Sequence, residues 1–219
     1  MGILESFCKF IYDDDEICYG CGSKTENRNH ICSSCRSCIE YVENNNTNRV
    51  KYIDEMYSVA YYNGLLRELI HKYKYEKASY LSNFFGELLV EFLLEKQIIS
   101  RIDEIYYVPT YKSVEANRAY NQCRLIANYL GEVLDVKVDD GNLYKSGNTY
   151  DQIDLSGKER RENLKDVFSV KDKHLIKGKN ILLIDDIITT GTTLERCGET
   201  LKKSGCSEII GLSITTTHH

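Results

Sequence analysis

The stretch of sequence that decides the fold reads Ile181-Leu182-Leu183-Ile184-Asp185-Asp186-Ile187-Ile188-Thr189-Thr190-Gly191-Thr192-Thr193-Leu194. Its four leading apolar residues have the length and composition of a buried parallel strand. Two adjacent carboxylates follow, and then a hydroxyl-rich turn with one glycine leads into a helical pattern. Ligands of open α/β sheets bind at the carboxyl ends of the strands. The sequence therefore predicts a central strand with a ligand site at its end.

The turn after the carboxylates has the chemistry of an anion site. Free backbone N–H groups at a helix start, joined by threonine hydroxyls, suit a phosphate monoester, and a glycine lets the backbone approach it closely. We expect the phosphate to be held by Thr189, Thr190, Gly191, Thr192 and Thr193. Asp185 and Asp186 would repel a phosphate unless they bind sugar hydroxyls, a divalent cation or both. A simple helix cap would need only one such residue. Neither GxxxxGK[ST] nor GxGxxG occurs in the chain, so an ATPase or a dinucleotide-binding protein has no support.

Strand-like and helical patterns alternate along the rest of the chain. Short apolar runs predict strands, which we expect at 57–62, 105–108, 181–184 and 209–214. Apolar residues spaced by three and four predict helices, which we expect at 4–11, 65–73, 80–97, 119–134 and 191–203. This alternation indicates an α/β fold with a mostly parallel sheet and helices on both faces.

One stretch, 145–179, does not follow this alternation. It holds nine Lys or Arg residues against six Asp or Glu residues, and Gly147, Asn148 and Gly157 loosen its first part. Such a composition is typical of a mobile, basic loop near an anionic ligand. A solvated surface connection explains the same composition.

The cysteines at the start of the chain predict a metal site. Six of the nine cysteines lie within the first 38 residues, where Cys18, Cys21, Cys32 and Cys35 form a CxxC–x10–CxxC pattern. Two such pairs can place four thiolates around one zinc ion. Cys38 overlaps the second pair and is an alternative fourth ligand, and His30 is a weaker one. A closed four-thiolate site leaves no position for a substrate, so we expect a structural zinc.

Composition limits the remaining possibilities. The 219 residues include 28 basic and 33 acidic ones, so bulk positive charge cannot drive nucleic-acid binding. The most hydrophobic stretch, 84–94, is interrupted by Glu87 and Glu91, and no secretory signal pattern is present. We therefore expect a cytoplasmic protein without membrane insertion. The polar stretch 43–48 predicts a linker between a head at 1–46 and a second domain at 47–219.

The run Ile181 to Leu194 closely resembles the motif that binds phosphoribosyl pyrophosphate (PRPP) in type I phosphoribosyltransferases. Other segments resemble the ComF family, the competence-associated branch of these proteins. These segments are Tyr62 to Lys77, Val108-Pro109, Arg118-Ala119-Tyr120-Asn121-Gln122, and the spaced residues Gln152, Leu155, Arg160, Asn163 and Phe168. The likeness covers essentially the whole chain. It implies a type I phosphoribosyltransferase-like fold with a small N-terminal zinc-binding head.

The resemblance also implies an activity. A family member of this kind binds Mg-PRPP and transfers phosphoribose with release of pyrophosphate, in competence and DNA uptake or in nucleotide metabolism. The resemblance assigns the ribose 2′- and 3′-hydroxyls to Asp185 and Asp186, and the 5-phosphate to the turn from Thr189 to Thr193. Mg²⁺ accompanies the diphosphate. Lys112, Arg118 and, on loop closure, Arg160 stabilise the leaving pyrophosphate.

A second function belongs to a different class: a non-catalytic competence factor that is regulated by PRPP and binds single-stranded DNA. Basic and aromatic side chains interleave in one helical segment, as Arg67, His71, Lys72, Tyr73, Lys74, Tyr75 and Lys77. Such a strip can stack bases and contact phosphates, although a solvated helix face explains it equally well. The chain also departs from the family pattern. Lys112 and Arg118 are the only cations in a loop that is usually richer in them, and Ala119 replaces a glycine.

Overall fold

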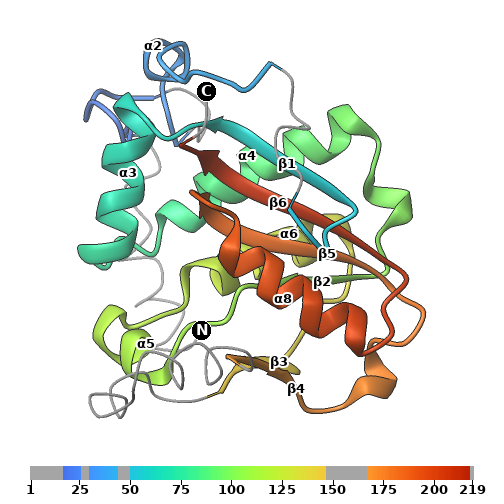
Figure 1. The fold of residues 1–219 in the computed structure, drawn as a ribbon. Helices are drawn as coiled ribbons and strands as arrows, with labels where there is room; N and C mark the ends of the chain where they lie inside the picture. The colour runs from blue at the N-terminus through green and yellow to red at the C-terminus, as the bar shows by residue number, and fades with distance from the viewer. Residues whose placement is uncertain (1–16, 26–29, 44–49, 147–166, 218–219) are drawn as a thin grey trace, which may run out of the picture.

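The computed structural model describes residues 17–25, 30–43, 50–146 and 167–217. A four-stranded sheet in the order β1-β6-β5-β2 lies at its centre (Figure 1). The strands are β1 (Glu55–Tyr61), β2 (Glu104–Tyr107), β5 (Asn180–Ile188) and β6 (Glu208–Thr216). All three pairings between them are parallel. The prediction of a mostly parallel sheet with β5 inside it is confirmed.

Helices cover both faces of this sheet, as the sequence predicts. They are α3 (Gly64–Tyr75), α4 (Leu81–Lys96), α5 (Lys112–Arg118), α6 (Gln122–Leu134) and α8 (Thr192–Lys203), with the 3-10 turns η1 (Ile99–Arg101) and η4 (Lys173–Leu175). The paired helices α4 and α6 lie on one face and α8 lies on the other (Figure 1). Gly86 permits the close approach of α4 to α6, because a Cβ there would lie 2.2 Å from Cδ1 of Tyr129. The resulting core is continuous through both layers.

The structure differs from the sequence prediction on either side of the site. The predicted helix at 119–134 begins later, at Gln122, and a separate helix, α5, precedes it. Ala119 lies between them with a φ of 72°, which interrupts the helical conformation. The predicted loop at 145–179 begins at the end of β3 (Leu143–Lys145) and contains β4 (Phe168–Val170), which pairs with β3 in an antiparallel ribbon, and then η4. The predicted helix at 4–11 lies outside the described residues.

Both edges of the sheet are partnered. Backbone bonds from Val42 to Val59 and from Tyr61 to Glu40 hold a segment of the N-terminal region antiparallel to β1. At the opposite edge, the Ile105 N–H donates to the Lys137 carbonyl, 2.8 Å away. Such pairing leaves fewer free backbone groups for contacts with other chains.

The cysteine-rich region packs against α4 and the start of α3, where Gly20 lies close to Leu65. It contains the short helix α2 (Ser33–Arg36), and Arg36 forms an ion pair with Glu91 of α4. The Tyr19 ring lies 4.8 Å from the Tyr80 ring, edge to face. Cys18 and Ile31 are buried in the same core as the sheet residues. The division into 1–46 and 47–219 stays a prediction.

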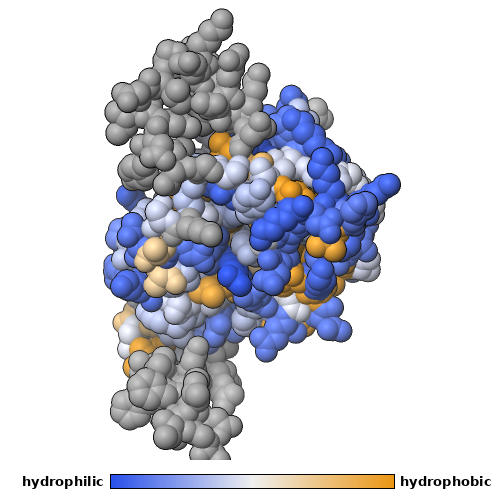
Figure 2. Space-filling model, turned by 90° about the horizontal axis from the view of Figure 1, so that it is seen from below, coloured by the Kyte–Doolittle hydropathy of each residue, from blue (hydrophilic) through white to orange (hydrophobic). Residues whose placement is uncertain are grey.

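The surface of the described part of the chain shows no sign of a membrane span. None of its helices combines the length and the apolar character that crossing a membrane requires. The face in Figure 2 is largely hydrophilic, and its apolar side chains are scattered in small groups.

Candidate functional site

The acidic pair lies on β5, at a level of the sheet where its neighbour β2 has ended and its other neighbour, β6, continues. β5 extends through the pair to Ile188, and on the β6 side Asp185 still lies opposite Ser213. On the β2 side, the ladder ends when the Val108 N–H donates to the Ile184 carbonyl. The next residue is Pro109, which has no N–H to continue the pairing. Asp185 and Asp186 therefore lie beyond the end of β2, at the carboxyl edge of the sheet.

Lys74 of α3 forms a buried ion pair with the second carboxylate. Its Nζ donates to Oδ1 of Asp186 at 2.9 Å, and the two side chains are only 17% and 11% exposed. Burial alone would lower the pKa of Lys74, but the Asp186 charge outweighs it and raises that pKa. Lys74 is therefore a charged member of the site. One feature of the sequence points to this role: Lys74 follows the buried Ile70 by four residues, which places it on the inward face of α3.

Asp185 lies in a different environment from Asp186. Burial, together with the neighbouring Asp186 charge, raises the pKa of Asp185 to about 7. Its Oδ1 accepts the Asp186 N–H at 2.9 Å and faces the Cys123 thiol at 3.8 Å. The sequence carries no signal for Cys123, because it is a single cysteine in a helical segment. Its thiol is buried and meets the acidic pair from α6.

The predicted phosphate turn connects β5 to α8. Gly191 is the residue before α8 and has a φ of 73°, the left-handed conformation that favours glycine. A Cβ on Gly191 would also lie 2.9 Å from Cγ2 of Val50. Thr190 and Thr192 are exposed, and their Oγ1 atoms lie 2.9 Å apart. The first turn of α8 has no side-chain cap, so its N–H groups and these hydroxyls suit an anion.

Two of the three predicted cations lie at opposite ends of α5. Lys112 begins α5. Arg118 ends α5, with its guanidinium 5.3 Å from the centre of the Tyr75 ring and a bond to Oε1 of Gln122. Arg160 lies outside the described residues. Among the described residues, Arg118 therefore contacts Tyr75, the neighbour of Lys74 in the sequence. The cation that contacts the acidic pair itself is Lys74.

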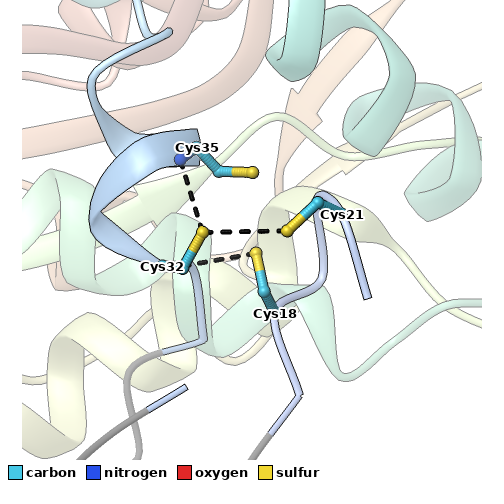
Figure 3. A group of neighbouring side chains, drawn as sticks. All are labelled: Cys18, Cys21, Cys32 and Cys35. Atoms are coloured by element: carbon cyan, nitrogen blue, oxygen red, sulfur yellow. Dashed lines mark hydrogen bonds between the residues drawn. The ribbon is translucent and has the colours of Figure 1, made fainter. Parts of the chain in front are cut away.

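The four predicted cysteine ligands lie together, although they come from two separate segments. The Sγ atoms of Cys18, Cys21, Cys32 and Cys35 all lie within 4.8 Å of one another (Figure 3). Cys32 precedes α2, and its Sγ accepts the Cys35 N–H. The Sγ atoms of Cys21 and Cys32 are 3.7 Å apart. Two sulfurs bound tetrahedrally to zinc at about 2.3 Å would be separated by about 3.8 Å, so this donor set fits zinc.

Hydrogen bonding prepares one of these thiols for a metal. Side-chain and backbone bonds to Ser23 lower the pKa of Cys21 to about 6, so Cys21 is a thiolate at neutral pH. Burial and the neighbouring thiols raise the pKa of Cys35. Cys35 would therefore lose its proton only when a metal compensates the added charge.

The two alternative ligands lie outside the cluster. The Cys38 thiol is exposed and donates to the Ser34 carbonyl. His30 stacks on the Tyr19 ring, and its Nε2 is 3.4 Å from Oε1 of Glu87. Among the described residues, the four thiols that could bind one metal ion are therefore those of Cys18, Cys21, Cys32 and Cys35.

Comparisons with known proteins found one family model, curated relatives and solved structures that this chain resembles. A family model described as "Phosphoribosyl transferase domain" matches residues 124–216, which include the acidic pair and the turn. "Competence protein F" of Haemophilus influenzae is 29% identical over 200 residues, which are 88% of this chain and 87% of that protein. "Competence protein ComFC" of Bacillus subtilis is 26% identical and covers 88% of this chain and 80% of its own length. The structure of a purine phosphoribosyltransferase from Pyrococcus horikoshii matches 62% of this chain and 82% of its own, with 20% identity and a TM-score of 0.39.

The parallel sheet, the matched domain and the N-terminal cysteine cluster define a phosphoribosyltransferase-like protein with a small head that could hold zinc. The competence proteins that match along nearly the whole chain narrow this class. Along nearly its whole length, the chain is similar to competence proteins of the ComF type.

The two aspartates should respond differently to substitution. A carboxyl whose pKa is higher folded than unfolded costs stability as the pH rises from about 4 to about 7, at about 1.4 kcal/mol for each unit of difference. Asp185→Asn should therefore be more stable than the parent at pH 8 and equal to it below pH 4. Asp186→Asn leaves Lys74 buried without its partner and should lose about 3–5 kcal/mol at pH 8.

Urea unfolding at both pH values measures these differences. The parent protein at each pH is the control. Equal loss of stability in the two variants at pH 8 would contradict the distinction between the paired and the protonatable carboxyl.

Proposed function

We propose that the protein binds Mg-PRPP at the carboxyl edge of β5 and transfers phosphoribose to an acceptor with release of pyrophosphate. The observation that carries this proposal is the acidic pair beyond the end of β2, followed directly by the uncapped, hydroxyl-rich turn before α8. Carboxylates accept hydrogen bonds from hydroxyls, and a helix start binds phosphate. A sugar phosphate presents both groups. The family match over the same residues supports PRPP as that sugar phosphate.

The site's own residues divide the work of binding. Asp186 has one oxygen on Lys74, so its second oxygen is available to a ribose hydroxyl. Asp185 would take the other hydroxyl, and the turn at 189–193 would hold the 5-phosphate. Lys74 limits the rotation of the Asp186 carboxylate, because the ion pair fixes Oδ1. The acidic pair would thus accept hydroxyls in a set orientation.

Charge on the diphosphate must be offset before it can leave. Mg²⁺ bound with PRPP supplies part of that compensation. Lys112 and Arg118 of α5, together with Arg160, would supply the rest by stabilising the leaving pyrophosphate. The protein's contribution is then positioning and charge stabilisation, without a covalent nucleophile.

A double substitution separates the ribose contacts from the phosphate contacts. Asp185→Asn with Asp186→Asn should weaken PRPP binding by about a hundredfold or more, because two charge-assisted hydrogen bonds of about 1.5–3 kcal/mol each are weakened or lost. Inorganic phosphate needs only the turn, and the removal of two nearby negative charges should leave its affinity unchanged or higher. Calorimetric titration of both ligands measures the contrast. PRPP binding equal to that of the parent would overturn the assignment of the pair.

A second candidate function is regulated binding of single-stranded DNA. One observation favours it: the Tyr75 ring is 62% exposed and carries His71 on one side and Arg118 over its face. The strip is smaller than the sequence predicted, because Tyr73 is fully buried and Lys74 is paired with Asp186. Salt-dependent binding of oligonucleotides without pyrophosphate release would favour this function over the transferase.

We also propose that the cysteine cluster holds one structural zinc ion. Its four sulfurs leave no open position, so the ion would stabilise the head and take no part in the reaction. The head in turn contacts the sheet through β1 and rests on α4.

Loss of one ligand should release this metal. Cys32→Ser removes the thiolate that precedes α2 and should reduce the zinc content from about one ion per chain to near zero, with loss of ordered structure in the head. Cys38→Ser is the matched control, because Cys38 lies outside the cluster. Elemental analysis of the reduced, purified proteins measures the zinc. A parent protein without zinc would rule out the proposed ion.

A further inference from the structure

Lys145 is a half-buried cation without an acidic partner among the described residues. It is the last residue of β3, and burial lowers its pKa. Its Nζ lies 4.2 Å from the centre of the Tyr111 ring and 5.5 Å from that of the Phe168 ring. Other lysines of comparable burial differ from it: Lys74 pairs with Asp186, and Lys179 pairs with Glu104.

This arrangement costs free energy unless an anion completes it. Partial burial of an ammonium removes hydration, and aromatic rings return only part of that loss. A lysine that served only to pack the ribbon would lose nothing on replacement by an apolar side chain. A cation that lies over two rings, and that meets no carboxylate within the part of the chain that the structure describes, instead suits a negatively charged ligand.

The position of Lys145 connects it to the acidic pair. Tyr111 immediately precedes α5, so the ammonium faces the segment that begins after β2 ends. Cys197 of α8 responds to both groups: burial raises its pKa, the Asp185 charge adds to that rise, and the Lys145 charge opposes it. Lys145 and Asp185 therefore act on the same buried thiol from their respective strands.

We propose that Lys145 binds the diphosphate end of the sugar phosphate held at the β5 edge. This inference rests on the proposed function. The 5-phosphate already has the turn at 189–193, which leaves the diphosphate as the anionic group that still needs cations. The contribution of Lys145 would add to those assigned to Lys112 and Arg118 on the neighbouring α5.

Four proteins and three ligands test this assignment. Calorimetric titrations compare the parent with Lys145→Met, Lys145→Arg and Lys171→Met, using PRPP, inorganic pyrophosphate and ribose 5-phosphate as probes. Lys171 is the matched control, because it is an exposed lysine that follows β4 and lies 6.0 Å from the Tyr144 ring.

The diphosphate assignment predicts a selective loss. Lys145→Met should weaken binding of PRPP and pyrophosphate by about tenfold or more, the equivalent of one charge-assisted hydrogen bond. Its binding of ribose 5-phosphate should be unchanged. Lys145→Arg should retain most of the affinity, and Lys171→Met all of it. The melting temperature of Lys145→Met should be equal to or above that of the parent, because a desolvated charge has been removed.

Two results would overturn the assignment. In the first, Lys145→Met binds pyrophosphate and PRPP as tightly as the parent does. In the second, Lys145→Met loses as much affinity for ribose 5-phosphate as it loses for pyrophosphate and PRPP. The titrations of the parent protein show whether only the role of Lys145 fails or the proposed function fails as well. If the parent binds PRPP and Lys145→Met binds it equally well, only the role of Lys145 fails. If the parent binds none of the three ligands, both proposals fail.

Discussion

The buried ion pair between Lys74 and Asp186 is the interaction on which the site depends. Two adjacent carboxylates near the interior of a sheet repel one another and lose hydration. The structure meets this constraint in two ways: Lys74 neutralises Asp186, and the pKa of Asp185 rises to about 7. Together with Lys74, the two aspartates therefore carry less than one net negative charge at neutral pH, and the ion pair ties α3 to the carboxyl edge of β5.

Much of the fold could be predicted from the sequence, because its strongest signals are local. The apolar run before Asp185 and the glycine of the turn specify the starts of β5 and α8, which both lie within one residue of the prediction. β5 continues beyond the predicted 181–184, through the acidic pair to Ile188. The order of the strands in the sheet and the β3–β4 ribbon could not be predicted. The strands of that ribbon have three residues each, and they pair across more than twenty residues of intervening chain. Such short, non-local pairing leaves no periodic pattern in the sequence.

The candidate site shows the same division. Asp185, Asp186 and the turn were predictable because they are contiguous in the sequence, and the cysteines because their spacing fixes two ligand pairs. The contacts of Lys74, Cys123 and Lys145 come from three other elements. Their roles depend on tertiary packing. The helical spacing places Lys74 on the inward face of α3, but its partner, Asp186, is defined only when α3 packs against the edge of β5. Arg160 and its predicted closure lie outside the described residues and stay a prediction.

The most direct test of the sugar-phosphate site is a crystal structure of the protein with PRPP bound. We expect the ribose hydroxyls within hydrogen-bonding distance of Asp185 and Asp186, with the 5-phosphate on the turn at 189–193 and Lys74 still beside Asp186. PRPP bound at another part of the molecule, or bound at this edge with its ribose away from both carboxylates, would contradict the assignment of the acidic pair.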